Sequence, residues 1–307
     1  MIRLKKTRLK DVGEFGFIEL AAKILSSPVK NVIKGIGDDA AVLDIGRKEL
    51  LLLTTDMLVE GVHFTRSMNA RSIGHKSLAC NISDIAAMGG IPSCAVISLG
   101  VPPNLNLRFV QELYQGINRL AKKFSVSIVG GDTVKSAKIV INIALLGNVF
   151  KENLLLRCGA KKGNRIFVSG PLGKSFVTKK HLRFTPKVDA AQYLAREFKP
   201  TSMIDISDGL CGDLGHILKE SSVGAVIYEK LIPKTKGATL NNALYDGEDF
   251  ELLFTLSSQE ANQLIRMKKN RFPFWYIGDI VDEKEKLTIV SGSGKRIALK
   301  PKSFSHF

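Results

Sequence analysis

The sequence predicts an α/β protein of two domains. Its 307 residues suit two domains of ordinary size, or one large domain. Hydrophobic residues make up 45% of the chain and charged residues 24%, which is ordinary for a globular protein. Over the first half, short apolar runs typical of buried strands alternate with amphipathic helical patterns. This alternation indicates an α/β fold.

The first half of the chain contains three helical patterns with apolar residues on one face. We expect helices at 13–25, 71–88 and 105–124. The third is the clearest, because Val110, Leu113 and Ile117 recur at helical spacing. Between the helices, apolar runs predict strands at 50–55, 94–99, 126–129 and 138–149.

A predicted turn at 157–164 begins the second half, so we expect domains of residues 1–150 and 151–307. Residues 203–210 are typical of a strand that enters a helix. Further strands are expected at 165–169, 223–229, 252–256, 274–280 and 287–290, and a helix at 257–268. Gly170–Ser175 is similar to a P-loop, but it has two residues between the glycines where that motif needs four, so we exclude it.

The stretch Leu50–Phe64 ends its apolar run in polar residues. Thr54, Thr55 and Asp56 stand at the end of the predicted strand, where α/β proteins usually place ligands. Their oxygens are the hard donors that Mg²⁺ prefers. A strand that runs into a turn capped by Asp56 explains the same residues equally well. The stretch alone leaves both interpretations open.

Four more acidic groups lie beside glycines or at predicted element ends: Asp38 with Asp39, Asp84, Asp132, and Asp205 with Asp208. Each alone is compatible with a turn or a helix cap. Five groups together favour a metal site, because so many carboxylates cannot converge without cations. Carboxylates with few histidines select Mg²⁺ or Mn²⁺ over zinc. Several such ions suggest a polyphosphate ligand, and ATP is the commonest.

The net charge of +16 is high for this length. It is compatible with nucleic acid, a membrane surface or an anionic small substrate. The lysines are spread along the whole chain, and no basic block alternates with aromatic residues as a base-stacking surface would require. We therefore expect no nucleic-acid binding, and the charge fits phosphate-rich substrates better.

The cysteines indicate a reducing compartment. Cys80, Cys94, Cys158 and Cys211 are scattered and form no C-x-x-C pair. The N-terminus lacks the apolar core of a signal peptide, and no apolar run approaches the roughly 20 residues of a membrane helix. We expect a soluble, cytoplasmic protein that does not bind membranes.

Seven motifs occur in an order that resembles a known family: GEFGFIE, GIGDDAA, TTDMLVEGVHF, NISDIAAMGG, GGDT, DISDGL and DGEDFEL. Together they resemble the thiamine-monophosphate kinases, which belong to the aminoimidazole-ribonucleotide synthetase-like superfamily. The resemblance implies two domains, each a mixed sheet with helices packed on one face. It also implies a homodimer whose N-terminal domains pair into a β-barrel, with ATP between the domains. The N-terminal domain would carry the metal and ATP-phosphate site, and the C-terminal domain would complete the ATP and substrate sites.

The resemblance also implies roles for individual residues. The metal ligands would be Asp39, Thr54, Thr55, Asp56, Asp84, Asp132, Asp205 and Asp208. The ATP contacts would be Tyr114, Gly131, Asp132, Arg157 and Ser207. The contacts to thiamine monophosphate would be His63, Glu248 and Phe304. Val134-Lys135-Ser136 and Cys211-Gly212 depart from the family pattern without removing a primary carboxylate.

The expected reaction is direct transfer of the ATP γ-phosphoryl group to thiamine monophosphate, assisted by several Mg²⁺ ions. The acceptor phosphate is ionised at neutral pH, so no strong general base is needed, which suits a chain with five histidines. The alternatives are a related enzyme with another acceptor, a non-catalytic nucleotide-binding relative and a basic nucleic-acid-binding protein. A selenophosphate synthetase would carry a reactive cysteine in a glycine-rich N-terminal segment, whereas the first cysteine here is Cys80, within a predicted helix.

Overall fold

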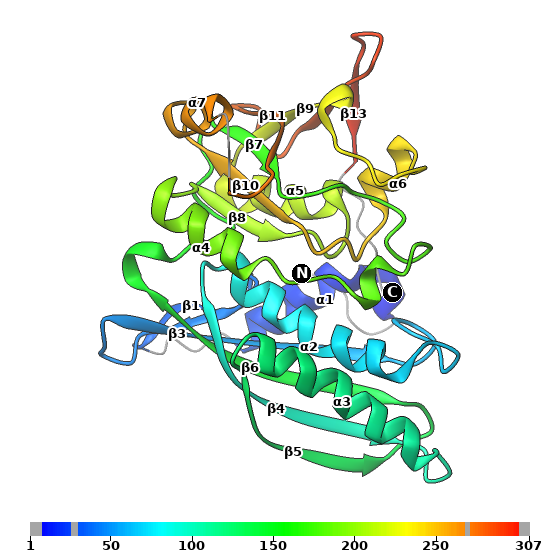
Figure 1. Ribbon diagram of the computed structural model, residues 1–307. Coiled ribbons are helices and arrows are strands. Elements are labelled where there is room, and N and C mark those ends of the chain that lie inside the picture. Colours follow the sequence, from blue (N-terminus) through cyan, green and yellow to red (C-terminus); the bar gives the residue numbers. More distant parts are fainter. Residues whose placement is uncertain (1–7, 26–29, 268–270, 301–307) are drawn as a thin grey trace.

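A computed structural model describes residues 8–25, 30–267 and 271–300. Their strands form two sheets, one from each half of the chain (Figure 1). The elements of the first half, in chain order, are α1 (Leu9–Ile24), β1 (Val32–Lys34), β2 (Ala41–Leu43), β3 (Glu49–Val59), α2 (Ala70–Ala87), β4 (Ile91–Val101), α3 (Leu107–Lys123), β5 (Ser127–Lys135) and β6 (Val140–Phe150). The first sheet has the strand order β1-β2-β3-β6-β4-β5, and only β4 and β5 pair in parallel.

Helices α2 and α3 lie on the face of this sheet that is turned towards the second half (Figure 1). Each begins at an asparagine whose side chain accepts a backbone N–H of the first turn, Asn69 from Ser72 and Asn106 from Arg108. The two helices cross in close backbone contact. A Cβ atom on Gly74 would lie 2.0 Å from the Leu113 carbonyl oxygen, so only glycine permits this crossing.

Strand β3 alternates between the two faces of the sheet, as the period of a strand requires. Leu52, Thr54 and Leu58 are buried beneath the helices. Leu53 and Met57 lie on the opposite face, where they are 41% and 54% exposed. The sheet therefore has one covered face, which contributes to the core, and one open face.

The second half forms a seven-stranded sheet with the order β13-β12-β9-β11-β7-β10-β8. Its elements are β7 (Arg165–Val168), α4 (Val188–Glu197), β8 (Ser202–Asp205), α5 (Leu210–Ser221), β9 (Gly224–Tyr228), α6 (Leu240–Tyr245), β10 (Leu252–Leu256), α7 (Ser258–Arg266), β11 (Trp275–Val281), β12 (Leu287–Val290) and β13 (Arg296–Leu299). Short 3₁₀ turns occur at Lys151–Asn153, Lys180–Leu182 and Glu229–Leu231. Only β9 and β12 pair in parallel.

Helix α2 also forms the boundary between the two halves, because it contacts β8, α4 and the Lys180–Leu182 turn. Aromatic packing adds to this boundary. The rings of Phe184 and Phe250 stack with their centroids 4.1 Å apart, and His75 of α2 packs edge-on against Phe184. The loops that follow β7 and precede β10 are therefore held against the helix that carries Asp84.

The predicted α/β fold with helices packed on mixed sheets is confirmed, and so are the helices expected near 71–88, 105–124 and 257–268. The strand expected at 126–129 is longer than predicted, because β5 continues through Gly130–Thr133 to Lys135. Gly131 permits the close pairing of β5 with β4, since a Cβ at this position would lie 1.9 Å from the Ile97 carbonyl oxygen. Helix α4 was not predicted. Among the described residues, no helix is long and apolar enough to cross a membrane.

The crossing of α2 and α3 generates a prediction about stability. In Gly116→Ala the new Cβ would lie 1.9 Å from the Arg71 carbonyl oxygen, so the helices must separate. We expect the free energy of unfolding to fall by about 3 kcal/mol, the upper range for overpacking. Urea denaturation measures it. Gly292→Ala is the matched control, because its Cβ meets nothing nearer than 3.8 Å. Equal stability of the two variants would contradict the role of the crossing.

Candidate active site

Three carboxylates meet at the boundary between the two halves of the chain. Asp39, Asp84 and Asp205 each present one oxygen atom, and these atoms lie within 4.8 Å of one another. Asp39 precedes β2, Asp84 lies on α2 and Asp205 ends β8. We call these three residues the carboxylate cluster. Because two members come from the first half and one from the second, the cluster exists only when the halves are packed together.

Two hydroxyl groups orient the carboxylate cluster. Thr54 Oγ1 donates to Asp84 Oδ2 at 2.6 Å, and Ser83 Oγ donates to Asp205 Oδ2 at 2.5 Å. Ser83 and Asp205 belong to different halves of the chain, so the second bond also ties the halves together. Each hydroxyl engages one oxygen of its carboxylate, which leaves the other oxygen directed elsewhere. Thr54 thus acts on the cluster through Asp84.

Burial and mutual repulsion raise the pKa values of the clustered acids. Burial, followed by the charges of Asp56 and Asp205, raises the pKa of Asp84 well above its usual range. Burial and the charge of Asp39 raise the pKa of Asp205 to about 8. A carboxyl group with such a pKa resists ionisation unless a positive charge lies beside it. The cluster therefore has a strong electrostatic preference for cations.

Arg157 supplies one positive charge to this cluster. Its Nη2 donates to Asp39 Oδ1 at 2.6 Å. The second oxygen of Asp39, Oδ2, is buried and finds no hydrogen-bond partner in the part of the chain that the structure describes. A buried acceptor without a partner is costly. This orphaned oxygen beside two further carboxylates fits the donor set of an oxygen-coordinated divalent cation.

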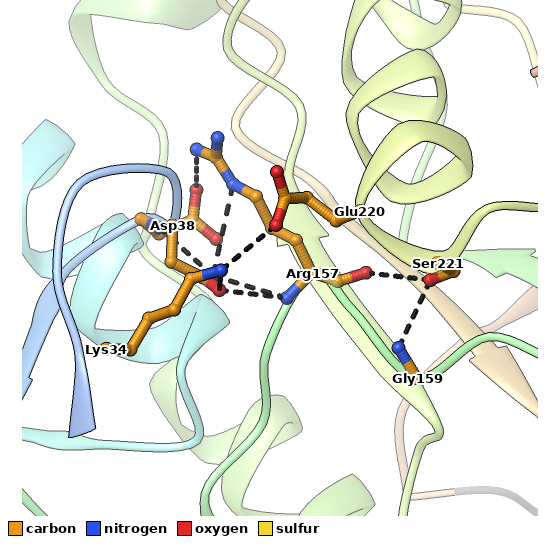
Figure 2. A network of polar contacts seen from close by, with 7 residues as sticks. Lys34, Asp38, Arg157, Gly159, Glu220 and Ser221 are labelled. Atoms are coloured by element: carbon orange, nitrogen blue, oxygen red, sulfur yellow. Dashed lines mark hydrogen bonds and ion pairs between the residues drawn. The ribbon is translucent and has the colours of Figure 1, made fainter. Parts of the chain in front are cut away.

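A polar network holds Arg157 in place (Figure 2). The Asp38 carboxylate accepts the Arg157 backbone N–H at 3.2 Å and lies 3.7 Å from Lys34 Nζ. Lys34 in turn pairs with Glu220 at 3.0 Å. Ser221 Oγ accepts the backbone N–H of Gly159, which anchors the connecting segment to the end of α5. Arg157 therefore has a fixed backbone from which its guanidinium reaches Asp39.

Asp56 and Asp208 lie next to the carboxylate cluster. The Asp56 backbone N–H donates to Asn81 Oδ1 at 3.1 Å, which fixes this part of β3 on α2, three residues before the strand ends at Val59. Burial, together with the charges of Asp208 and Asp39, raises the pKa of Asp56 to about 6. Asp208, Asp213 and His216 form a second group whose ligand atoms also lie within 4.8 Å of one another. Acidic oxygens thus extend from the cluster along the start of α5.

Two cavities adjoin the carboxylate cluster on different sides. One, of about 750 Å³, is lined by Arg157, Gly212, His216 and residues of α1, and we call it the large cavity. The other, of about 660 Å³, is lined by His63, Lys174 and Glu248 and has an apolar wall of Val62, Phe176 and Val177. We call it the apolar-walled cavity. Both are also lined by the same five residues, Glu14, Asp56, Asp84, Ser207 and Asp208. Two ligands could therefore meet at these acids.

The structure brings most of the predicted site residues to these cavities. They are Asp39, Thr54, Asp56, His63, Asp84, Arg157, Asp205, Ser207, Asp208 and Glu248. Thr55 reaches the edge of the large cavity, but its hydroxyl donates to Asn142 on β6. Tyr114, Gly131 and Asp132 lie elsewhere, on α3 and on the edge strand β5. Phe304 falls outside the described residues.

Several residues of the site were not predicted. Ser83, Lys76 and His181 make side-chain contacts across the boundary between the halves. Ser83 adjoins the predicted Asp84, but no local pattern joins it to Asp205, which lies 122 positions away. Asp213 and His216 lie on α5, and their ligand atoms meet that of Asp208, which precedes the helix. Their spacing of three residues within a helix was the one signal that could have found this pair.

Residues 37–149 match the family model of the AIR synthase related protein, N-terminal domain, and residues 159–290 match that of its C-terminal domain. Thiamine-monophosphate kinase of Buchnera aphidicola subsp. Schizaphis graminum is 34% identical over 97% of this chain and 99% of its own. Thiamine-monophosphate kinase of Aquifex aeolicus is 35% identical over 98% of this chain and 100% of its own. A solved structure of AaThiL complexed with AMPPCP and TMP has a TM-score of 0.86 and 33% identity, covering 99% of this chain and 100% of that one.

The raised pKa of Asp205 predicts how stability depends on pH without divalent cations. A carboxyl group with a raised folded-state pKa binds its proton more tightly in the folded protein. The free energy of unfolding therefore falls as pH rises from 3.8 towards about 8. Asp205→Asn keeps an oxygen for Ser83 but removes this loss, so at pH 8 it should be more stable than the wild type by about 2 kcal/mol.

Urea denaturation in a chelator at pH 5 and pH 8 measures this difference. Asp282→Asn is the control, because Asp282 forms only an exposed ion pair with Lys162, and such pairs contribute little to stability. Adding Mg²⁺ at pH 8 should stabilise the wild type more than Asp205→Asn. An Asp205→Asn protein that is less stable than the wild type at pH 8 without metal would contradict the electrostatic account.

Proposed function

The chain belongs to the thiamine-monophosphate kinases of the AIR synthase related family, and we propose that it phosphorylates thiamine monophosphate with ATP to give thiamine diphosphate. The observation that carries this proposal is the carboxylate cluster between two cavities. A transfer between two phosphate compounds requires two anions to meet at one point. The cluster, once it holds cations, is such a point.

The large cavity is assigned to ATP. It has room for a nucleotide, and Arg157 and Ser207 line it beside the cluster. A guanidinium provides a planar fork that suits phosphate oxygens. The similar AaThiL structure contains AMPPCP, an analogue of ATP, which supports a nucleotide in this family. Arg157 contacts Asp39 Oδ1 and leaves Oδ2 for a cation, so the guanidinium and an ion would share this carboxylate.

The carboxylate cluster fits Mg²⁺. Asp39, Asp84 and Asp205 would hold the ions, with Asp56 and Asp208 beside them, and the orphaned Asp39 Oδ2 is an acceptor in place for one. A bound ion would supply positive charge that neutralises the charge developing on the phosphate groups during transfer. Thr54 and Ser83 keep the carboxylates oriented through their hydrogen bonds.

The apolar-walled cavity is assigned to thiamine monophosphate. Val62, Phe176 and Val177 would supply apolar surface for its two rings, and Glu248 would supply a negative charge for the cationic thiazolium. The Val59 backbone N–H donates to His63 Nδ1 at 3.0 Å, so the neutral imidazole carries its proton on Nε2 and is a donor there. TMP in the AaThiL complex supports this kind of ligand.

The transfer needs little proton chemistry from the protein. The acceptor phosphate has a second pKa of about 6 and is largely a dianion at neutral pH. It can attack the γ-phosphorus of ATP as it stands, with ADP leaving in line. The residues of the site therefore bind, orient and exclude water, and positioning accounts for most of the acceleration.

We propose that the active protein is a homodimer in which β5 completes the partner's site. Strand β5 is exposed along its whole length, and the open face of the sheet carries exposed Leu53 and Met57. Tyr114, Gly131 and Asp132, all expected to contact ATP, gather on this edge. Asp132 lies three strands from β3, roughly 14 Å at ordinary strand spacing. Pairing of two open faces would bring this edge to the partner's cluster.

In this arrangement residues 1–150 provide Asp39, Asp56, Asp84 and the dimer contacts. Residues 151–307 provide Arg157, Asp205 and the loop of Glu248. The four cysteines are free thiols, which fits the reducing cytoplasm as the proposed location.

The function is tested by incubating the protein with ATP, Mg²⁺ and thiamine monophosphate and measuring thiamine diphosphate. We expect one ADP for each thiamine diphosphate. Asp84→Asn should lower turnover at least about 100-fold because it removes a shared cation ligand. Asp282→Asn should retain turnover. ATP hydrolysis without thiamine diphosphate, or an active Asp84→Asn protein, would overturn the assignment.

The partner contribution is tested by co-expressing Asp84→Asn with Asp132→Asn, each inactive alone. If β5 serves the partner, a hybrid dimer contains one site with both native residues. Random pairing makes half of the dimers hybrids, so activity should recover to about a quarter of the wild type. If Asp132 acts within its own chain, no intact site forms and the mixture stays inactive.

A further inference from the structure

Lys76 is a fully buried lysine on α2 that belongs to neither acidic group. Its Nζ donates to the His63 carbonyl oxygen at 3.0 Å and to Glu248 Oε1, and it lies 3.1 Å from His181 Nδ1. Two of the three N–H donors of the ammonium therefore have an acceptor, and His181 Nδ1, which donates to Glu248 Oε2, lies beside the third. A buried charge held by two acceptors has a defined geometry, because moving it would leave a donor unpaired.

The three neighbours of Lys76 come from three separate segments. His63 follows β3, Glu248 precedes β10, and His181 lies in the Lys180–Leu182 turn. His63 and Glu248 both line the apolar-walled cavity. Lys76 is not among the residues that line it, so the ammonium lies behind the wall and joins the backbone of one lining residue, His63, to the side chain of another, Glu248.

Glu248 needs such support. Its φ angle is +65°, a left-handed conformation that non-glycine residues rarely adopt and that costs energy. The surrounding contacts hold it there: its N–H donates to the Ser207 carbonyl oxygen, and its own carbonyl accepts from Ser175 Oγ, both at 2.6 Å. Lys76 and His181 then hold the two carboxylate oxygens. Backbone and side chain of Glu248 are therefore both fixed.

His181 extends the arrangement to an aromatic wall. Its ring is fully buried and stacks on Phe176, with centroids 4.6 Å apart and planes 20° apart. Phe176 lines the cavity and is 48% exposed. The position of Phe176 thus depends on the imidazole that contacts Glu248 Oε2 at 3.1 Å.

We propose that Lys76 is a positioning residue for the acceptor, which it serves by fixing His63 and Glu248 in the wall of the apolar-walled cavity. This inference rests on the proposed function. Without the ammonium, Glu248 would be a largely buried carboxylate whose remaining side-chain partner is His181, and it would move or take up a proton. Either change alters the wall that faces the cationic ring. Among the described residues, the lining of the large cavity includes neither His63 nor Glu248, so ATP binding should be spared.

The test compares Lys76→Met with the wild type in the KM for thiamine monophosphate and the KM for ATP. Methionine keeps length and apolar volume while removing the charge. We expect the acceptor KM to rise at least about tenfold and the ATP KM to stay within about twofold. Lys180→Met is the matched control. It removes ion pairs with Asp249 and Glu251 on the adjacent loop without touching His63 or Glu248. It should leave both KM values near those of the wild type.

If the Lys76→Met protein does not fold, a second variant tests the same proposal. His181→Leu removes the other partner of Glu248 without leaving an unpaired lysine, and it should raise the acceptor KM alone, by about threefold. Calorimetric titration with thiamine monophosphate makes the same comparison without turnover. Variants that raise both KM values equally, or neither, overturn the role of Lys76 while the proposed function stands. A wild-type protein that neither converts nor binds thiamine monophosphate overturns both.

Discussion

Repulsion among three buried carboxylates is the constraint on which the site depends. Asp39, Asp84 and Asp205 converge within 4.8 Å, and burial raises the pKa of each. Arg157 compensates only Asp39 directly. The folded chain therefore has uncompensated negative charge at one point. Cations that bind there can also hold phosphate groups, so the repulsion in the free protein favours the binding of metal-bound phosphates.

The contacts that hold the two halves together also organise the chemistry. Ser83 of α2 donates to Asp205 of β8, and Lys76 of the same helix contacts Glu248. One helix thus orients a carboxylate on one side and shapes the wall of a cavity on the other. A change in the packing of α2 should alter both the cluster and the acceptor wall, whereas the edge strand β5 is independent of them. In the proposed homodimer, the site would thus have a part made by one chain and a part supplied by the second chain.

Sequence patterns predicted the residues whose function depends on local position. Asp205 stands at the end of β8, where ligand-binding oxygens are expected, whereas the strand of Asp56 continues past the predicted end to Val59. The partners of Lys76 could not be predicted, because Glu248 lies 172 positions away and His181 lies 105 positions away. Only the fold brings them together. Asp132 was grouped with the other acids because GGDT resembles a phosphate-binding turn, but the structure places it on an edge strand. The sheet order, which no local pattern reports, separates it from β3.

The central claim is that cations on the carboxylate cluster touch both substrates. It is tested most directly by adding Mn²⁺ to the protein with a non-hydrolysable ATP analogue and thiamine monophosphate, and recording the ³¹P resonances. A paramagnetic ion beside both phosphates broadens the signals of both ligands, and Asp84→Asn should abolish the broadening. Broadening of the nucleotide signals alone would contradict the account, since the acceptor phosphate would then lie away from the cluster.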